Sequence, residues 1–316
     1  MSELAARAER IGWPDHDAET AASRHGRRIG ALDDLVRWLA GVQGSYPPAA
    51  PRRPRLVVFA ADHGVALEDV SLNRVGHATA SAQALRSGSL EPAGIAAGAG
   101  VGIVVVESAL SGRIDQEDAL PLDEVEKAIA LGGAVADQEI DAGADLLIVA
   151  SVGAGSSTCA ATLISVLTAV EPIRCVGRGS GIGDAAWMRK ASIVRDARRR
   201  GWPHRSEPLD LLRVVGGADV AAMVGFALHA AARRTPVLLD GVLTAAAALV
   251  AASVQPRIPR WQQVPQLTPE PAQRLAANQL GLVPIVDLGL SIADGTGGLL
   301  ALPLVQTAVR LHLADV

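Results

Sequence analysis

The stretch that decides the fold is residues 147–163, Leu-Ile-Val-Ala-Ser-Val-Gly-Ala-Gly-Ser-Ser-Thr-Cys-Ala-Ala-Thr-Leu. Its first four residues form a short apolar run with the length and composition of a buried parallel strand. Gly153 and Gly155 then interrupt the run, and three hydroxyl residues can cap the apolar helix that follows: Ser156, Ser157 and Thr158. Small residues let backbone N–H groups approach a ligand, and a helix start carries partial positive charge. The stretch therefore indicates a phosphate-binding turn, although an ordinary tight turn explains a lone Gly-x-Gly equally well.

The composition indicates a large α/β protein. The chain has 316 residues, of which 49% are hydrophobic, 3% are aromatic and 32 are glycine. A chain of this length can bury a large core, as one domain or as a domain with a small satellite. The balance suits Ala-, Val- and Leu-rich helices packed on a parallel sheet, and it argues against disorder. A net charge of −4 without a long basic block argues against nucleic acid as a partner.

No stretch of the sequence indicates secretion or membrane insertion. Cys159 and Cys175 stand in apolar runs without the paired spacing of a metal site, as core thiols do in a reducing cytosol. Residues 1–10 carry acids and no apolar stretch that resembles a signal peptide. No uninterrupted apolar run reaches the roughly 18 residues that a membrane helix needs. We therefore expect a soluble, cytoplasmic protein without a membrane partner or a metal site.

The hydrophobic pattern predicts strands that alternate with helices. Strands are expected at residues 56–61, 101–106, 147–150, 172–176, 237–239 and 285–288. Helices are expected at residues 31–42, 78–97 (interrupted by Gly88 and Pro92), 122–141, 185–199, 219–233 and 243–253, with one more ending at 280 and a closing helix to about 313. Since such alternation builds right-handed βαβ units, the expected fold class is α/β, with one mostly parallel sheet flanked by helices.

Five of the predicted strands lead into polar or glycine-rich turns, at residues 62–64, 153–158, 177–181, 240–241 and 294–298. In a doubly wound sheet such ends converge on one crevice, and glycine turns with a few acids suit a sugar-phosphate ligand there. Simpler interpretations stay open for single residues. Asp240 can cap the helix that follows it, and His63 is as readily a structural histidine as a substrate contact.

The order of these motifs resembles the nicotinate-nucleotide:dimethylbenzimidazole phosphoribosyltransferase (CobT) family. Residues 59–66, Phe-Ala-Ala-Asp-His-Gly-Val-Ala, with Val-Ser at 70–71, are similar to the opening motif of that family. Further matches follow in the family's order: the turn at 153–158, Val-Gly-Arg-Gly-Ser-Gly at 176–181, Gly-Gly-Ala-Asp at 216–219, Leu-Leu-Asp-Gly at 238–241, and Asp-Gly-Thr-Gly at 294–297 before Leu-Ala-Leu-Pro at 300–303. The resemblance runs from about residue 29 to about residue 311.

The resemblance implies an activity and an architecture. The family moves phosphoribose from nicotinate mononucleotide to a benzimidazole nitrogen with inversion, in cobalamin lower-ligand assembly, without a metal or redox cofactor. It implies a Rossmann-like α/β domain at residues 51–300, with a small helical domain to which residues 1–50 and the closing helix at 301–316 contribute. It also implies a homodimer, with a heterodimer with a homologue as the alternative.

The resemblance also assigns site residues. Asp294 stands where the family has its general-base glutamate, and Lys190 matches a family lysine near the nucleotide. The phosphate is expected on the turn formed by Gly153, Gly155, Ser156, Ser157 and Thr158. The other expected substrate-binding residues are Asp62, His63, Ser71, Ser151, Gly177, Arg178, Gly179, Asp240, Gly295, Thr296 and Gly297.

The sequence departs from the family at several site positions. Asp294 is one methylene, or about 1.5 Å, shorter than glutamate. Ser151 replaces an acid, and Asn73 replaces an aromatic residue. A family His-Ser-Glu-Gly-His segment is reduced to Glu270-Pro271. Three interpretations follow: an active transferase on dimethylbenzimidazole or a related aglycone, a catalytically weak paralogue that binds a nucleotide or serves as a partner subunit, or an unrelated nucleotide-binding α/β protein.

Overall fold

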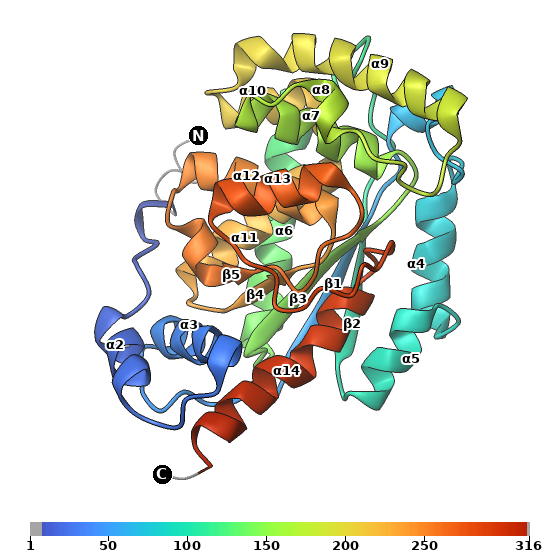
Figure 1. Cartoon of the computed structure of the whole chain (residues 1–316). Coiled ribbons are helices and arrows are strands. Elements are labelled where there is room, and N and C mark those ends of the chain that lie inside the picture. Colours follow the sequence, from blue (N-terminus) through green and yellow to red (C-terminus); the bar gives the residue numbers. More distant parts are fainter. Residues whose placement is uncertain (1–7, 315–316) are drawn as a thin grey trace.

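The computed structural model describes residues 8–314, which fold around a five-stranded sheet (Figure 1). The strands are β1 (Pro54–Ala60), β2 (Gly102–Glu107), β3 (Leu146–Val152), β4 (Val237–Leu239) and β5 (Gln262–Gln263). They lie in the order β2-β1-β3-β4-β5, and every pair is parallel. The expected α/β class with a mostly parallel sheet is therefore confirmed. In this order the chain reverses its direction of growth between β1 and β3, where open α/β sheets bind ligands.

Helices separate the strands along most of the chain. They are α2 (His16–Arg24), α3 (Asp33–Gln43), α4 (His77–Ser87), α5 (Glu91–Gly98), α6 (Leu122–Asp141), α7 (Ser156–Thr168), α8 (Pro172–Cys175), α9 (Asp184–Gly201), α10 (Pro208–Val215), α11 (Ala218–Ala232), α12 (Val242–Val254), α13 (Pro271–Leu280) and α14 (Thr296–His312). Short 3-10 turns lie at Gly30–Leu32, Gly64–Glu68, Trp202–His204 and Ile258–Trp261. The predicted helices are confirmed, including the break between α4 and α5 at Gly88.

Two predicted strands are wrong. Residues 172–176 contain the short helix α8, because Pro172 occupies its first turn, where the fixed φ of proline favours a helix start. Residues 285–288 form no strand; the segment pairs with the sheet only through an isolated bridge between Val264 and Pro284 and two further backbone hydrogen bonds. Short apolar runs do not distinguish strands from other buried segments by pattern alone, which explains both errors.

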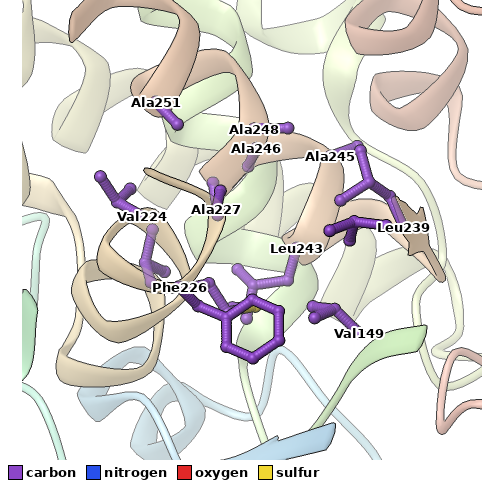
Figure 2. Close-up of a cluster of buried hydrophobic side chains, with 14 of the residues drawn as sticks. Val149, Val224, Phe226, Ala227, Leu239, Leu243, Ala245, Ala246, Ala248 and Ala251 are labelled. Atoms are coloured by element: carbon purple, nitrogen blue, oxygen red, sulfur yellow. The ribbon is translucent and has the colours of Figure 1, made fainter. Parts of the chain in front are cut away.

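Both faces of the sheet are covered, as residues of β1 show. Leu56 and Phe59 are three positions apart and therefore point to opposite faces. Leu56 meets the start of α14, since a Cβ on Gly295 would lie 2.7 Å from its methyl carbons. Phe59 stacks edge-on against Phe226 of α11, with ring centroids 5.8 Å apart. On the Phe226 side the core consists mostly of small side chains of α11 and α12 packed on β3 and β4 (Figure 2).

Helices α6 and α11 cross at very short distance because each carries glycine at the contact. A Cβ on Gly132 would lie 1.7 Å from the carbonyl oxygen of Ala222, and a Cβ on Gly225 would lie 2.0 Å from that of Ile129. Neither position has room for a larger residue without a shift of the helix backbone. These two glycines therefore set the distance between α6 and α11. Because α11 also packs on β1, they influence how far α6 lies from the sheet.

Helices α3 and α14, from near the two ends of the described residues, pack together beside the sheet (Figure 1). Helix α14 contacts α3, the backbone amide of Arg27 donates to the carbonyl of His312 at 2.9 Å, and the Tyr46 hydroxyl and His312 Nε2 are 3.3 Å apart. The boundaries 1–50, 51–300 and 301–316 stay a prediction: α14 crosses residue 300 without a break, and residues 1–7 and 315–316 lie outside the described residues. Among residues 8–314, no helix combines the length and apolar character that crossing a membrane requires.

Candidate active site

A cavity of about 1290 Å³ lies at the carboxyl ends of β1 and β3. The structure brings ten of the predicted site residues into its wall: Ser71, Ser151, Gly153, Gly155, Ser156, Ser157, Gly177, Arg178, Gly179 and Asp294. It places the other eight outside the lining: Asp62, His63, Thr158, Lys190, Asp240, Gly295, Thr296 and Gly297. Residues of three of the five predicted turns, 153–158, 177–181 and 294–298, therefore meet at one cavity, although only the first of these turns follows a strand. Nearly half of the predicted residues stand behind the wall.

The turn between β3 and α7 forms one end of the cavity. Gly155 is the N-cap of α7 with φ +81°, a backbone conformation that favours glycine. The predicted hydroxyl cap is wrong, because no side chain caps α7, and the Ser156 hydroxyl instead donates to the carbonyl of Gly153 at 2.9 Å. The first amides of an α-helix have no i−4 acceptor within it, and those of α7 carry the positive end of its dipole toward the cavity.

Gly153 meets a packing requirement as well. A Cβ at this position would lie 1.7 Å from the carbonyl oxygen of Ala61, the residue directly after β1. The turn can therefore run against β1 only if residue 153 is glycine. Thr158, in the first turn of α7, is fully buried and lies outside the cavity lining.

The glycine turn at residues 177–181 closes over the start of α7. Gly179 has φ +51°, and a Cβ on it would lie 2.6 Å from the Ser157 hydroxyl oxygen. Lys190 of α9 reaches this point from behind: its ammonium donates to the Ser157 hydroxyl at 2.9 Å and to the Gly177 carbonyl at 3.0 Å. Burial lowers the pKa of Lys190, and the neighbouring Glu270 opposes that effect. Lys190 thus supports the two turns that form this part of the wall.

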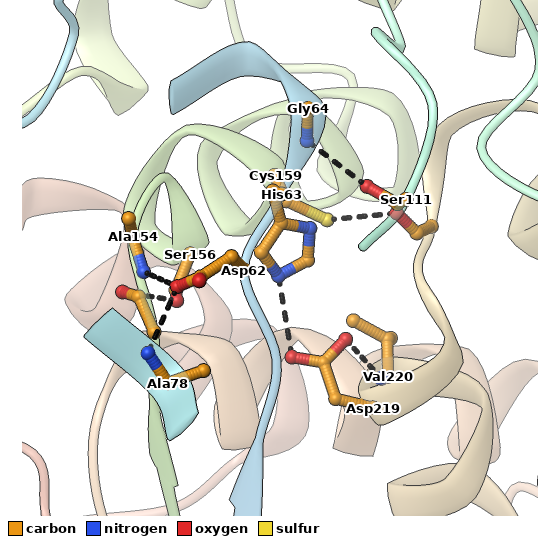
Figure 3. A network of polar contacts seen from close by, with 12 residues as sticks. Asp62, His63, Gly64, Ala78, Ser111, Ala154, Ser156, Cys159, Asp219 and Val220 are labelled. Carbon is orange, nitrogen blue, oxygen red and sulfur yellow. Dashed lines mark hydrogen bonds and ion pairs between the residues drawn. The ribbon is translucent and has the colours of Figure 1, made fainter. Parts of the chain in front are cut away.

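Asp62 does not line the cavity, but it holds together two segments that border it. Its carboxylate accepts hydrogen bonds from the amides of Gly76 at 2.6 Å, Ala78 at 3.1 Å and Ala154 at 2.7 Å. Two of these contacts appear in Figure 3. The first two amides belong to the start of α4 and the third to the β3–α7 turn, so Asp62 ties the two together.

His63 lies in the core beside Asp219 and Cys159 (Figure 3). Its Nε2 is 3.2 Å from a carboxylate oxygen of Asp219, and both side chains are 1% exposed. Burial alone would lower the pKa of His63, but Asp219 and Cys159 raise it to well above the usual value. This geometry therefore supports His63 as a structural histidine rather than as a substrate contact.

Two loops, one containing Ser71 and the other Ser180, contact each other at the mouth of the cavity. The hydroxyls of Ser71 and Ser180 are 3.2 Å apart, and the amide of Leu72 donates to Ser180 at 2.7 Å. Arg178 turns outward, where its guanidinium donates to the Ile182 carbonyl at 2.9 Å and to the Asp184 carboxylate at 2.5 Å. The Ser71–Ser180 contact holds the loop after β1 against the second glycine turn.

Asp294 lines the cavity, and Asp240 lies behind it. One oxygen of Asp294 accepts a hydrogen bond from the amide of Thr296 at 3.1 Å. Asp240 is fully buried and does not cap its own helix; one of its oxygens accepts from the amides of Gly295 at 3.1 Å and Gly297 at 3.0 Å. Burial, reinforced by the charge of Asp294 and opposed by these amides, raises the pKa of Asp240 to about 7.

The glycines after Asp294 serve the packing of α14. A Cβ on Gly297 would lie 2.6 Å from an oxygen of Asp240, and a Cβ on Gly298 would lie 2.3 Å from Ile148 of β3. The motif at residues 294–298 therefore holds Asp294 at the cavity by packing the start of α14 tightly on the sheet and on Asp240.

Several lining residues were missed by the assignment of site residues. Trp187 lines the cavity, and its indole N–H donates to the Val176 carbonyl at 3.1 Å. His77 and Ser81 on α4 also line the cavity, with His77 Nε2 3.4 Å from the Ser81 hydroxyl oxygen. Glu270 lines the wall as well, and the sequence signal that could have found it is its survival in an otherwise altered family segment. Within residues 8–314, His, Cys, Asp and Glu side chains form no group of three that could hold a metal ion.

Comparison with known proteins gives one consistent result. A family model described as phosphoribosyltransferase matches residues 17–314. The nicotinate-nucleotide–dimethylbenzimidazole phosphoribosyltransferase of Streptomyces avermitilis is 45% identical to the chain over 303 residues, covering 90% of this chain and 81% of that protein. The protein of the same name from Mycolicibacterium paratuberculosis is 42% identical over 319 residues, covering 93% of this chain and 91% of its own.

Solved structures resemble the whole molecule. The crystal structure of CobT from Thermus thermophilus superimposes with a TM-score of 0.85 at 29% identity, covering 98% of this chain and 96% of that one. A crystal structure of nicotinate-nucleotide–dimethylbenzimidazole phosphoribosyltransferase from the same organism gives a TM-score of 0.88 at 28% identity, covering 94% of this chain and 96% of that one. The structural similarity therefore extends over nearly the full length of both chains.

Proposed function

The chain belongs to the nicotinate-nucleotide–dimethylbenzimidazole phosphoribosyltransferase (CobT) family, and we propose that it catalyses the reaction that this name describes. It transfers the phosphoribosyl group of nicotinate mononucleotide to dimethylbenzimidazole, a step of cobalamin lower-ligand assembly. Relatives at 42–45% identity that cover most of the chain carry this name, and they do not favour the catalytically weak paralogue. The observation that supports the proposal best is one cavity with a helix start at one part of its wall and the Asp294 carboxylate at another.

The phosphate of the nucleotide is proposed to bind at the start of α7. Gly153, Gly155, Ser156 and Ser157 line the cavity there, and the amides of a first helical turn suit an anion. Lys190 adds a positive charge directly behind Ser157. Because Lys190 is fully buried, it is proposed to position Ser157 and balance the phosphate charge rather than to contact the nucleotide directly.

Asp294 is proposed as the general base. The C1′–N bond to nicotinate breaks, its electron pair passes to the pyridinium nitrogen, and a benzimidazole nitrogen forms the new C1′–N bond with inversion. The proton on the benzimidazole ring passes to Asp294, which must lie within hydrogen-bond reach of it. The products are an α-ribosyl phosphate, nicotinate and that proton. The aspartate is one methylene shorter than the family's glutamate, so the aglycone is expected to sit correspondingly closer to α14.

A product assay tests this function. The purified protein is incubated with nicotinate mononucleotide and 5,6-dimethylbenzimidazole, and mass spectrometry measures the α-ribosyl phosphate. We expect product from the wild type and from the control Asp287→Ala, whose carboxylate is exposed and outside the cavity. We expect little product from Asp294→Ala. The absence of product from the wild type refutes the function, and undiminished product from Asp294→Ala refutes the assignment of the base.

A homodimer is proposed as the assembly, with a heterodimer with a homologue as the alternative. In support, several large apolar side chains are exposed in the single chain, among them Leu72 and Met188 at 65% and Val283 at 76%. Sedimentation velocity on the purified chain measures its mass. A monomer at all concentrations contradicts the homodimer.

A further inference from the structure

Glu270 directly precedes α13, but its side chain bonds to a distant segment of the chain instead of to this helix. It is the N-cap of α13 and precedes Pro271, but its side chain does not cap its own helix. Instead, Oε1 accepts a hydrogen bond from the amide of Gly179 at 2.6 Å, across 91 positions of the chain. A Cβ on Gly177 would lie 2.3 Å from the same oxygen, so the glycine turn packs directly on the carboxylate. Glu270 is 8% exposed, and it forms part of the cavity wall.

The other carboxylate oxygen of Glu270 lacks a donor. Within the part of the chain that the structure describes, Oε2 is buried and makes no hydrogen bond. The Lys190 ammonium is 3.6 Å away, an ion-pair distance that is too long for a hydrogen bond. That ammonium already donates to the Ser157 hydroxyl and the Gly177 carbonyl. A buried carboxylate oxygen without a donor is destabilising, so a group on the wall of a binding cavity has its natural partner in the ligand.

The chemistry of the nucleotide limits what that partner can be. In nicotinate mononucleotide the phosphate and the nicotinate carboxylate are anionic acceptors, which a second carboxylate repels. The pyridinium nitrogen carries no hydrogen. The donors that remain are the two ribose hydroxyls, and a carboxylate is a known acceptor for ribose hydroxyls in nucleotide-binding α/β folds. Ser157 and Glu270 both lie within 3.6 Å of the Lys190 nitrogen, so a phosphate at α7 and its own ribose can reach both.

We propose that Glu270 is a substrate-binding residue whose free carboxylate oxygen accepts a hydrogen bond from a ribose hydroxyl of the nucleotide. The inference rests on the proposed function, because it takes nicotinate mononucleotide as the ligand. Glu270 thereby distinguishes a ribonucleotide from a deoxyribonucleotide. Lys190 holds the carboxylate in place and balances its charge beside the phosphate.

The test combines Glu270→Gln with substrates that lack one hydroxyl. Calorimetry measures the binding of nicotinate mononucleotide and of its 2′-deoxy and 3′-deoxy analogues to the full-length protein, so that no turnover is needed. The matched control is Glu171→Gln, since Glu171 is also an N-cap before a proline but is exposed and outside the cavity. A hydrogen bond to a charged group corresponds to a roughly 10- to 100-fold effect on affinity.

The expected pattern is specific to ribose binding. The wild type and Glu171→Gln bind one deoxy analogue roughly 10- to 100-fold more weakly than the ribonucleotide. Glu270→Gln binds the ribonucleotide with a similar loss, and the deoxy analogue with little further loss. The inference is overturned if the wild type binds all three ligands equally, or if Glu270→Gln weakens all three by the same factor, as a purely structural tether would. Failure of the wild type to bind the ribonucleotide overturns both the inference and the proposed function, whereas binding without product formation contradicts the function alone.

Discussion

Replacing Asp240 by asparagine should remove a pH dependence of folding stability that this buried carboxyl creates. Its pKa is raised to about 7, first by burial and then by Asp294, against a usual value of about 3.9. A carboxyl whose pKa is raised on folding stabilises the protein fully below the unfolded pKa. That stabilisation is lost as the pH rises through the folded pKa. Asparagine resembles the protonated form and can still accept from the amides of Gly295 and Gly297.

The size of the effect follows from the shift. Three pKa units correspond to at most about 4 kcal/mol over the whole range, of which about 2.5 kcal/mol falls between pH 5 and pH 8. Urea denaturation of the wild type and of Asp240→Asn at both pH values gives four free energies of unfolding. Other titrating groups are common to both proteins and largely cancel in the double difference. We expect the wild type to lose about 2.5 kcal/mol more than the variant on going from pH 5 to pH 8.

The result that refutes this reasoning is an equal pH dependence in the two proteins. Asp240 would then be ionised throughout that range, stabilised by its hydrogen bonds to the amides at the start of α14. A larger loss in the variant than in the wild type would contradict even the sign. Circular dichroism at both pH values checks that Asp240→Asn is folded before the comparison is made.

Three further predictions concern the base, the core and the buried histidine. Asp294→Ala should lower kcat by roughly 10²- to 10⁴-fold while Asp294→Glu stays active, as steady-state product formation will show, and full kcat in the alanine variant contradicts the assignment. Gly225→Ala should lower the free energy of unfolding by about 1–3 kcal/mol, because its Cβ meets the α6 backbone. Gly94→Ala in α5 has open space and should be neutral or stabilising by up to about 1 kcal/mol, so equal urea-denaturation effects of the two changes contradict the packing argument. NMR titration should find the pKa of His63 well above its usual value, and it should find that Asp219→Asn lowers this pKa. The stability that the pair contributes is lost as the pH rises through the folded pKa, and a usual pKa near 6.5 would contradict this.

Residues that only support the site were hard to separate from those that line it. Asp62, His63 and Asp240 follow β1 and β4 directly, as ligand-binding residues do, but each turns its side chain into the protein. A strand end exposes alternate side chains to the crevice and to the interior, and the motif spacing is the same in both cases. Glu270 and Trp187 were missed because Trp187 lies within a helix and Glu270 directly before one, and neither follows a predicted strand, so no local pattern marks them as cavity residues.

The sequence by itself determined most of the elements, the parallel sheet and the meeting of glycine turns at one edge, because these depend on local hydrophobic periodicity and turn chemistry. It also determined the family, through motifs kept in order along the chain. Only the tertiary structure decided which side of each turn faces the cavity and that α8 replaces a strand. It alone showed that Glu270 reaches Gly179 and Lys190 at the cavity wall. These features depend on contacts between segments distant in the chain, whose geometry no local pattern carries.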